Sequence, residues 1–209
     1  MNTIPHLAKR IFSSLLIFGA VLAAPHAAVS QAVVGSQAPQ FTVKDSTGKE
    51  ISLSSFKGKV VVLEWFNPGC PFVKKFYRNG DMQRFQQELG AKGVAWLTID
   101  SSAPGKSGHL TAAQAETTRT DLGMKSSALL LDESGTIGKS YGARTTPHMF
   151  VISADGKVAY AGAIDSESST DSDDIVKATN YVVAAVDNLL ANKPVEVSST
   201  EAYGCSVKY

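Results

Sequence analysis

The sequence is poor in cysteine, in charge of one sign and in long apolar runs. It contains only Cys70 and Cys205, so only one intramolecular disulfide can form. The formal net charge is +1 and no basic block occurs, which argues against nucleic acid or an anionic membrane surface as a partner. There are no repeats and no long linker. With 44% hydrophobic residues, the composition is typical of one domain with a proper core.

Residues 1–32 are predicted to be a signal peptide. Lys9 and Arg10 form a charged start, residues 11–24 are apolar, and small residues around 30–32 offer a cleavage site. An uncleaved anchor is the alternative, but the apolar run is shorter than the roughly 20 residues that span a bilayer. We therefore expect a periplasmic or secreted domain, residues 33–209, with a net charge near −1 and no membrane association after cleavage.

A buried strand followed at once by a helix is the clearest local pattern. Residues 60–66 form a near-continuous apolar run rich in β-branched residues, as expected of a central strand. Residues 67–69 (Asn-Pro-Gly) end it, and a helix begins at Cys70-Pro71, because proline fits the first helical position. Asn79-Gly80 should interrupt that helix.

The remaining elements alternate between strands and helices. After short N-terminal strands the predicted order is β-α-β-α-β-α, then a β-hairpin and a last helix, which indicates a mixed sheet with helices on both faces. The last helix is predicted from a cap at Ser172 through to Leu190. The acidic segment 165–174 is expected to be a solvated connection leading into it.

The predicted position of Cys70 suits a reactive thiol. A thiolate is the nucleophilic form of cysteine, and the free N–H groups and dipole of a helix start stabilise it. Lys74 and Lys75 would add positive potential if their side chains point back. The alternatives are an inert buried cysteine or one half of a structural disulfide.

Two segments carry a resemblance to the thioredoxin-fold superfamily. Residues 65–73 (WFNPGCPFV) resemble its active-site segment, with Cys70 in the place of the nucleophilic cysteine, and residues 145–147 (TTP) resemble its cis-proline loop. The resemblance implies a thioredoxin-like three-layer α/β/α sandwich with a mixed central sheet. It also implies that Pro147 is cis and that the backbone of Thr146 pairs with an incoming peptide or mixed disulfide.

The closest resemblance is to a peroxiredoxin-like branch of exported bacterial proteins, of the redoxin or thiol-specific-antioxidant type. That branch pairs a site like residues 69–72 (GCPF) with an end like residues 204–209 (GCSVKY). Val73 stands where a CxxC motif has its second cysteine. Asn67 and Leu63 stand where true peroxiredoxins carry the threonine and proline of their peroxide pocket.

Two polar residues accompany the Cys70 segment. Glu64 lies inside the apolar strand, so burial should raise its pKa unless it is paired, and it matches the place of the buried proton-shuttling acid of thioredoxins. The alternatives are an edge-facing side chain or a pair with a lysine such as Lys59. His148 follows Pro147, and a lone histidine is more often structural than a ligand.

Cys205 follows the last helix in a tail that can fold back. Three interpretations remain open: Cys205 resolves an oxidised Cys70, it forms a permanent staple with Cys70, or it stays apart from Cys70. A staple would close a loop of about 135 residues and contribute roughly 4–5 kcal/mol through chain entropy.

The leading hypothesis is an exported thiol–disulfide oxidoreductase or antioxidant protein. Cys70 would be the nucleophile and Cys205 the second thiol, with Glu64 as proton relay and Thr146-Pro147 as substrate platform. No cofactor motif occurs, so a redox partner protein must regenerate the thiol, and the substrate would be a protein disulfide or a peroxide. The alternatives are a copper or zinc module of Cys70, Cys205 and His148, and a structural domain with a staple disulfide.

Overall fold

The fold is built on one mixed sheet of five strands, seen in a computed structural model that describes residues 1–2 and 31–209. The predicted signal peptide lies almost wholly outside the described residues. The strand order is β5-β4-β3-β7-β8, with β3, β4 and β5 parallel and β7 and β8 antiparallel to their neighbours. The strands are β3 (Val61–Trp65), β4 (Ala95–Asp100), β5 (Ala128–Leu131), β7 (His148–Ile152) and β8 (Val158–Gly162).

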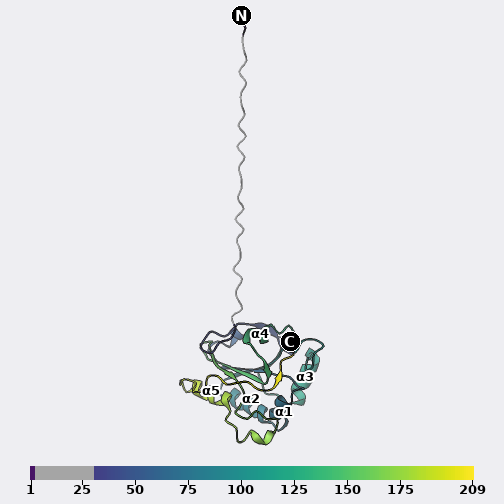
Figure 1. The fold of residues 1–209 in the computed structure, drawn as a ribbon, viewed down its shortest axis with the longest axis vertical. Helices are drawn as coiled ribbons and strands as arrows, with labels where there is room; N and C mark the ends of the chain where they lie inside the picture. Colours follow the sequence, from purple (N-terminus) through teal and green to yellow (C-terminus); the bar gives the residue numbers. More distant parts are fainter. Residues whose placement is uncertain (3–30) are drawn as a thin grey trace.

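Helices cover both faces of this sheet, as Figure 1 shows with α4 on one side and α1, α2 and α5 on the other. The larger core cluster packs the first face against α1 (Pro71–Arg78), α2 (Asp81–Ala91), α3 (Ala112–Asp121) and α5 (Tyr181–Leu190). The second cluster packs the other face against α4 (Thr136–Tyr141) and the hairpin of β1 (Thr42–Lys44) and β2 (Glu50–Ser52), which leads into a 3-10 turn, η1 (Leu53–Phe56). The predicted three-layer α/β/α sandwich with a mixed sheet is confirmed.

The largely apolar composition of β3 suits its position in the middle of the sheet. All five of its residues are buried, and it pairs with β4 on one side and β7 on the other. Because side chains alternate along a strand, Val62 faces the α1 side while Leu63 and Trp65 face the α4 side. Glu64 therefore points to the same face as Val62, beneath α1.

The predicted break between the first two helices is confirmed. Helix α1 ends at Arg78, and α2 begins at Asp81 after Gly80, whose φ of +84° lies in the left-handed region that glycine adopts without strain. The interruption lets α1 and α2 each present an apolar side to the same core cluster.

The prediction that the last helix begins after a cap at Ser172 is wrong. Ser172–Asp174 forms only a short 3-10 turn, η2, capped by Asp171, and α5 begins at Tyr181. The cap of this helix is Asn180 rather than Ser172, since Asn180 Oδ1 accepts the N–H of Val183 at 2.9 Å. The intervening chain is held by the loop before it, where Ser166 N–H donates to the Thr179 carbonyl.

The segment after α5 crosses the molecule, and we call residues 198–209 the strap. It first runs beside β8, where the Ala161 N–H donates to the Ser198 carbonyl and the Thr200 N–H to the Ala161 carbonyl. It then forms β9 (Cys205–Ser206), which pairs antiparallel with β6 (Thr145–Thr146). Figure 1 shows β9 in yellow close to α1. The strap thus brings Cys205 to the start of α1.

Candidate functional site

Cys70 occupies the N-cap position of α1, directly after the turn that ends β3. Asn67 shapes this turn, because its Oδ1 accepts the Gly69 N–H at 2.8 Å and its Nδ2 donates to the Ser107 carbonyl at 2.9 Å. Pro71 is the first helical residue, as predicted. Cys70 is a free thiol and only 2% exposed.

The sulfur of Cys70 lies among hydrogen-bonding groups. Its thiol donates to the Thr146 carbonyl oxygen at 2.9 Å. Burial raises the pKa of the Cys70 thiol, but hydrogen bonds with the Thr146 side chain, with the thiol and backbone of Cys205, and with the Val73 backbone outweigh it, so the pKa is lowered from its ordinary value. These donors stabilise a thiolate at this helix start.

Cys205 is the second free thiol, and its pKa shifts the opposite way. Burial, the hydrogen bond to Cys70 and the charge of a Cys70 thiolate together raise the pKa of Cys205 to about 11. The structure thus brings the two cysteines into contact and makes them unequal. Cys70 is the thiol that ionises first, and Cys205 is the one that keeps its proton.

Thr146 and Pro147 border the two thiols. The Thr146–Pro147 peptide bond is cis. Thr146 is paired with Cys205 across β6 and β9, and its hydroxyl donates to the Cys205 carbonyl at 3.4 Å. The site therefore contains Cys70, Cys205, Thr146 and Pro147 together, from three separate parts of the chain.

Glu64 is fully buried under α1 and surrounded by donors. Glu64 Oε1 accepts a hydrogen bond from Tyr77 Oη at 2.9 Å. Glu64 Oε2 accepts from Trp96 Nε1 at 2.8 Å, Thr98 Oγ1 at 3.1 Å and Gln86 Nε2 at 3.3 Å. Burial nevertheless dominates and raises the pKa of Glu64 to about 7. Its side chain is neither edge-facing nor paired with Lys59, and it can exchange a proton near neutral pH.

The raised pKa of Glu64 predicts a pH-dependent stability. The folded chain holds this proton more tightly than the unfolded chain, whose glutamate pKa is near 4.5. The contribution of Glu64 to the free energy of unfolding should therefore fall by about 3 kcal/mol as the pH rises from 4.5 through 7. Glu64→Gln should lack this decline in urea unfolding at pH 5 and pH 8. Glu88→Gln, on the exposed surface of α2, should keep the wild-type profile, and equal profiles for all three proteins would contradict the assignment.

His148 does not join the two cysteines, which corrects the proposed copper or zinc site. It is paired with Trp65 on the α4 side of the sheet, its ring packs against Phe150 at 4.7 Å, and its Nδ1 accepts the Arg144 N–H at 3.2 Å. Burial lowers its pKa to about 4. Within residues 1–2 and 31–209, no cluster of three metal-ligating side chains occurs.

Lys75 and Asp165 form a buried pair that the sequence did not indicate. Lys75 does not point back to Cys70. Its ammonium lies 3.5 Å from Asp165 Oδ2 and donates to the Glu167 carbonyl at 2.8 Å. Tyr203 of the strap donates its hydroxyl to the same Asp165 carboxylate. Asp165 is thus buried rather than solvated as expected, and we call Lys75, Asp165 and Tyr203 the latch.

The family follows from comparison with known sequences. The sequence model of the Redoxin family matches residues 33–178. The chain belongs to the redoxin family. This redoxin is 30% identical over 135 residues to a thiol-disulfide oxidoreductase ResA of Bacillus thuringiensis, a match that covers 60% of the chain and 66%, just under two thirds, of the relative. It is 48% identical over 79 residues to a chloroplastic peroxiredoxin Q of Suaeda salsa, which covers 36% of each protein.

Solved structures agree on the fold of this redoxin. An uncharacterized conserved protein from Geobacillus kaustophilus matches with a TM-score of 0.73 and 25% identity, over 85% of this chain and 92% of the other. The redoxin thus has a thioredoxin-like fold, as the resemblance of its Cys70 and Pro147 segments implied.

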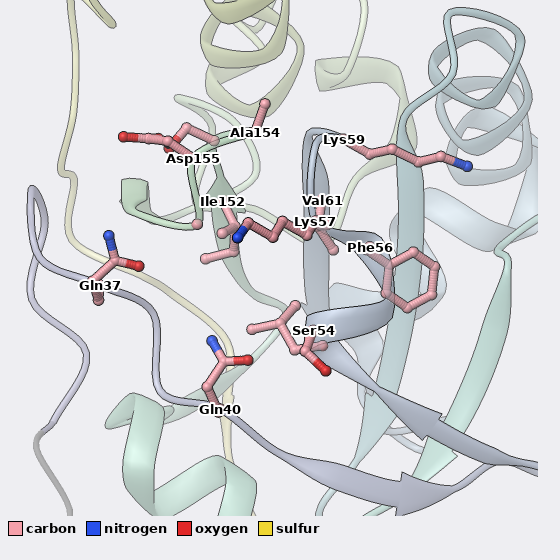
Figure 2. A pocket seen from close by; sticks show the side chains of 13 residues that line it. Gln37, Gln40, Ser54, Phe56, Lys57, Lys59, Val61, Ile152, Ala154 and Asp155 are labelled. Atoms are coloured by element: carbon pink, nitrogen blue, oxygen red, sulfur yellow. The ribbon is translucent and has the colours of Figure 1, made fainter.

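A separate cavity of about 470 Å³ lies at the opposite end of the sheet. It is lined in part by the start of β3, whereas Cys70 follows the end of that strand, roughly 13 Å further along. Figure 2 shows Gln37, Gln40 and Lys57 directed towards a common space, while Lys59 points away. Neither cysteine lines this cavity, so it is not part of the thiol site.

Proposed function

We propose that this redoxin is an exported thiol–disulfide oxidoreductase in which Cys70 is the nucleophile and Cys205 the second thiol. The observation that carries the proposal is the contact between two free thiols with opposite pKa shifts. A thiol with a low pKa is ionised near neutral pH and attacks readily. A neighbouring thiol with a high pKa stays protonated and does not compete with it until that attack has occurred. The similarity to thiol-disulfide oxidoreductase ResA proteins supports the same chemistry.

The proposed cycle exchanges one disulfide for another. The Cys70 thiolate attacks one sulfur of a substrate disulfide, a new bond joins Cys70 to that sulfur, and the other sulfur leaves as a thiolate. Cys205 then loses its proton and attacks the Cys70 sulfur, which releases the second substrate thiolate. The substrate gains two electrons and becomes two thiols, while Cys70 and Cys205 become a disulfide. A redox partner protein reverses this step to regenerate the thiols.

Three further residues receive proposed roles. Thr146 and Pro147 form the platform beside the sulfur, since the Thr146 carbonyl lies 2.9 Å from Cys70 Sγ. Glu64 is proposed as a proton relay, because its pKa of about 7 lets it accept or release a proton at neutral pH. Export rests on the signal-like residues 1–32, and within the part of the chain that the structure describes, no helix is long and apolar enough to cross a membrane.

A hydroperoxide is the second candidate oxidant, favoured by the peroxiredoxin Q match. The Cys70 thiolate would attack one peroxide oxygen and form a sulfenic acid, and the remaining oxygen would leave as an alcohol or water. Cys205 would then displace water to give the same Cys70–Cys205 disulfide. Both routes depend on the same pair of thiols.

The pH dependence of Cys70 alkylation tests the proposal. In Cys205→Ser, Cys70 is the only cysteine, and the serine hydroxyl can still donate to it. We expect its pKa to lie below the ordinary value of about 8.5. In Cys205→Ala that donor is lost, so the pKa should be higher than in Cys205→Ser. A pKa at or above 8.5 in Cys205→Ser would contradict the assignment of Cys70 as nucleophile.

A further inference from the structure

One buried carboxylate contacts both the helix that carries Cys70 and the strap that carries Cys205. Lys75 follows Cys70 on α1, and its ammonium lies 3.5 Å from Asp165 Oδ2. Tyr203 precedes Cys205 in the strap, and its hydroxyl donates to Asp165 Oδ1. Because both segments contact the same side chain, the position of one sulfur relative to the other depends on the latch as well as on the pairing of β9 with β6.

The ring of Tyr203 also packs directly on α1. It lies against Phe72, with ring centroids 5.8 Å apart, and the Lys75 ammonium lies 5.9 Å from the centroid of the Tyr203 ring. Both contacts come from the helix that begins beside Cys70. Tyr203 therefore fixes the strap to α1 just before Cys205, through its ring as well as its hydroxyl.

Asp165 is a firm partner for the Tyr203 hydroxyl. The residue is only 2% exposed, and its Oδ1 also accepts the Glu167 N–H at 3.0 Å. Burial, together with the hydrogen bond and the charge of Asp165, raises the pKa of Tyr203, so the hydroxyl keeps its proton and continues to donate. A hydrogen bond to a carboxylate is roughly twice as strong as one between neutral groups, such as that from Tyr209 to the Ala143 carbonyl.

The stretch of the strap before β9 has little other support. Thr200 is the preceding attachment, since its Oγ1 accepts the Ala163 N–H at 2.9 Å. From there to β9, within the described part of the chain, Tyr203 is the residue whose side chain forms a hydrogen bond. Gly204, which follows it, has no side chain. The latch is therefore what holds the approach to Cys205 in place.

We propose that Tyr203 is a positioning residue, and that the latch places Cys205 for its attack on the Cys70 sulfur. The inference rests on the proposed function and assigns a further residue to its second step. In that step Cys205 loses its proton to water and attacks Cys70 Sγ in the mixed disulfide. The Cys70–Cys205 bond forms, and the substrate sulfur leaves as a thiolate. Such an intramolecular step is fast only when the attacking atom is held close to its target.

A small symmetrical disulfide of a coloured aromatic thiol separates the two steps. The attack of Cys70 releases one coloured thiolate at a rate proportional to the disulfide concentration. The attack of Cys205 releases the second at a rate independent of that concentration. Excess disulfide makes the first step fast, so that absorbance then reports on the second. Mass spectrometry of acid-quenched samples distinguishes the mixed disulfide on Cys70 from the internal disulfide.

Tyr203→Phe keeps the ring contacts and removes only the hydroxyl. We expect it to slow the second step about tenfold, because one hydrogen bond to a charged group is lost, and to change the first step by less than twofold. The double variant Lys75→Met/Asp165→Leu removes the partner of that hydroxyl and should slow the second step similarly. Tyr209→Phe is the matched control, since it removes one hydrogen bond of the strap beyond β9. It should slow the second step less than threefold.

Two results would overturn the inference. One is a second step in Tyr203→Phe that stays within twofold of the wild type. The other is equal slowing by Tyr203→Phe and Tyr209→Phe, which would show that any loosening of the strap acts alike. A merely structural role would lower the Tm of Tyr203→Phe without changing the ratio of the two rates. Each of these results leaves the proposed function standing if the wild type still forms the internal disulfide. If the wild type releases no coloured thiolate, the proposed function fails and the inference with it.

Discussion

Cys70→Ser should lower the rate of disulfide exchange at least about a thousandfold, because a serine hydroxyl does not ionise near neutral pH and cannot replace a thiolate. The measurement is reduction of a small disulfide under excess reductant, followed by absorbance. Cys205→Ser should retain the first chemical step and stop there. Mass spectrometry of that variant should show a mixed disulfide on Cys70, whereas the wild type loses about 2 Da as Cys70 and Cys205 join.

The same two variants separate catalysis from a structural staple. A staple predicts that Cys70→Ser and Cys205→Ser lower stability equally and leave no exchange activity to lose. A reduction potential below about −300 mV, together with slow reaction of the wild type with glutathione, would also favour the staple. Retention of full exchange activity in Cys70→Ser would contradict the assignment of the nucleophile.

Asp165→Ala should destabilise the fold by about 3–5 kcal/mol, since it leaves the Lys75 ammonium buried without a counter-charge. The Lys75 side chain is fully buried, and the Asp165 carboxylate is also the acceptor for Tyr203. Thermal or urea unfolding measures the loss directly. For a domain of this size the expected fall in Tm is roughly 10 °C.

An exposed ion pair supplies the control for Asp165→Ala. Lys92 and Asp187 lie 2.6 Å apart, with side chains 47% and 49% exposed. Asp187→Ala should therefore cost less than about 1 kcal/mol. The double variant Lys75→Met/Asp165→Leu should recover much of the lost stability, because it removes the isolated charge. Equal effects of Asp165→Ala and Asp187→Ala would show that the latch contributes no more than a surface pair.

Local chemistry explains which parts of the fold the sequence predicts. The apolar run of β3, the proline at the start of α1 and the glycine before α2 each act within a few residues, so their patterns are readable without the fold. The prediction of where the last helix begins failed because the sequence offers two possible N-cap residues, Ser172 and Asn180. Ser172 and its acidic neighbours resembled a helix start, but Asn180 caps α5.

Contacts between distant segments explain what the sequence did not predict. Lys75 and Asp165 are 90 positions apart, and no spacing rule links a lysine on an apolar helix to the first residue of an acidic loop. From the sequence, His148 was expected near Cys70 because it follows Pro147. Strand register instead sets it across from Trp65, on the other face of the sheet. Even so, the motif around Cys70 and the tail cysteine did identify two thiols that the fold brings together.

The unequal burial of the two sulfurs has a consequence for the return half of the cycle. In a Cys70–Cys205 disulfide, an incoming reductant meets the half-buried Cys205 more easily than Cys70. Attack at Cys205 would expel Cys70, and the thiol of lower pKa is the better leaving group. Accessibility and leaving-group ability thus both favour attack at Cys205. Electrons would enter through the strap, and Cys70 would be released as a thiolate, ready to attack the next substrate.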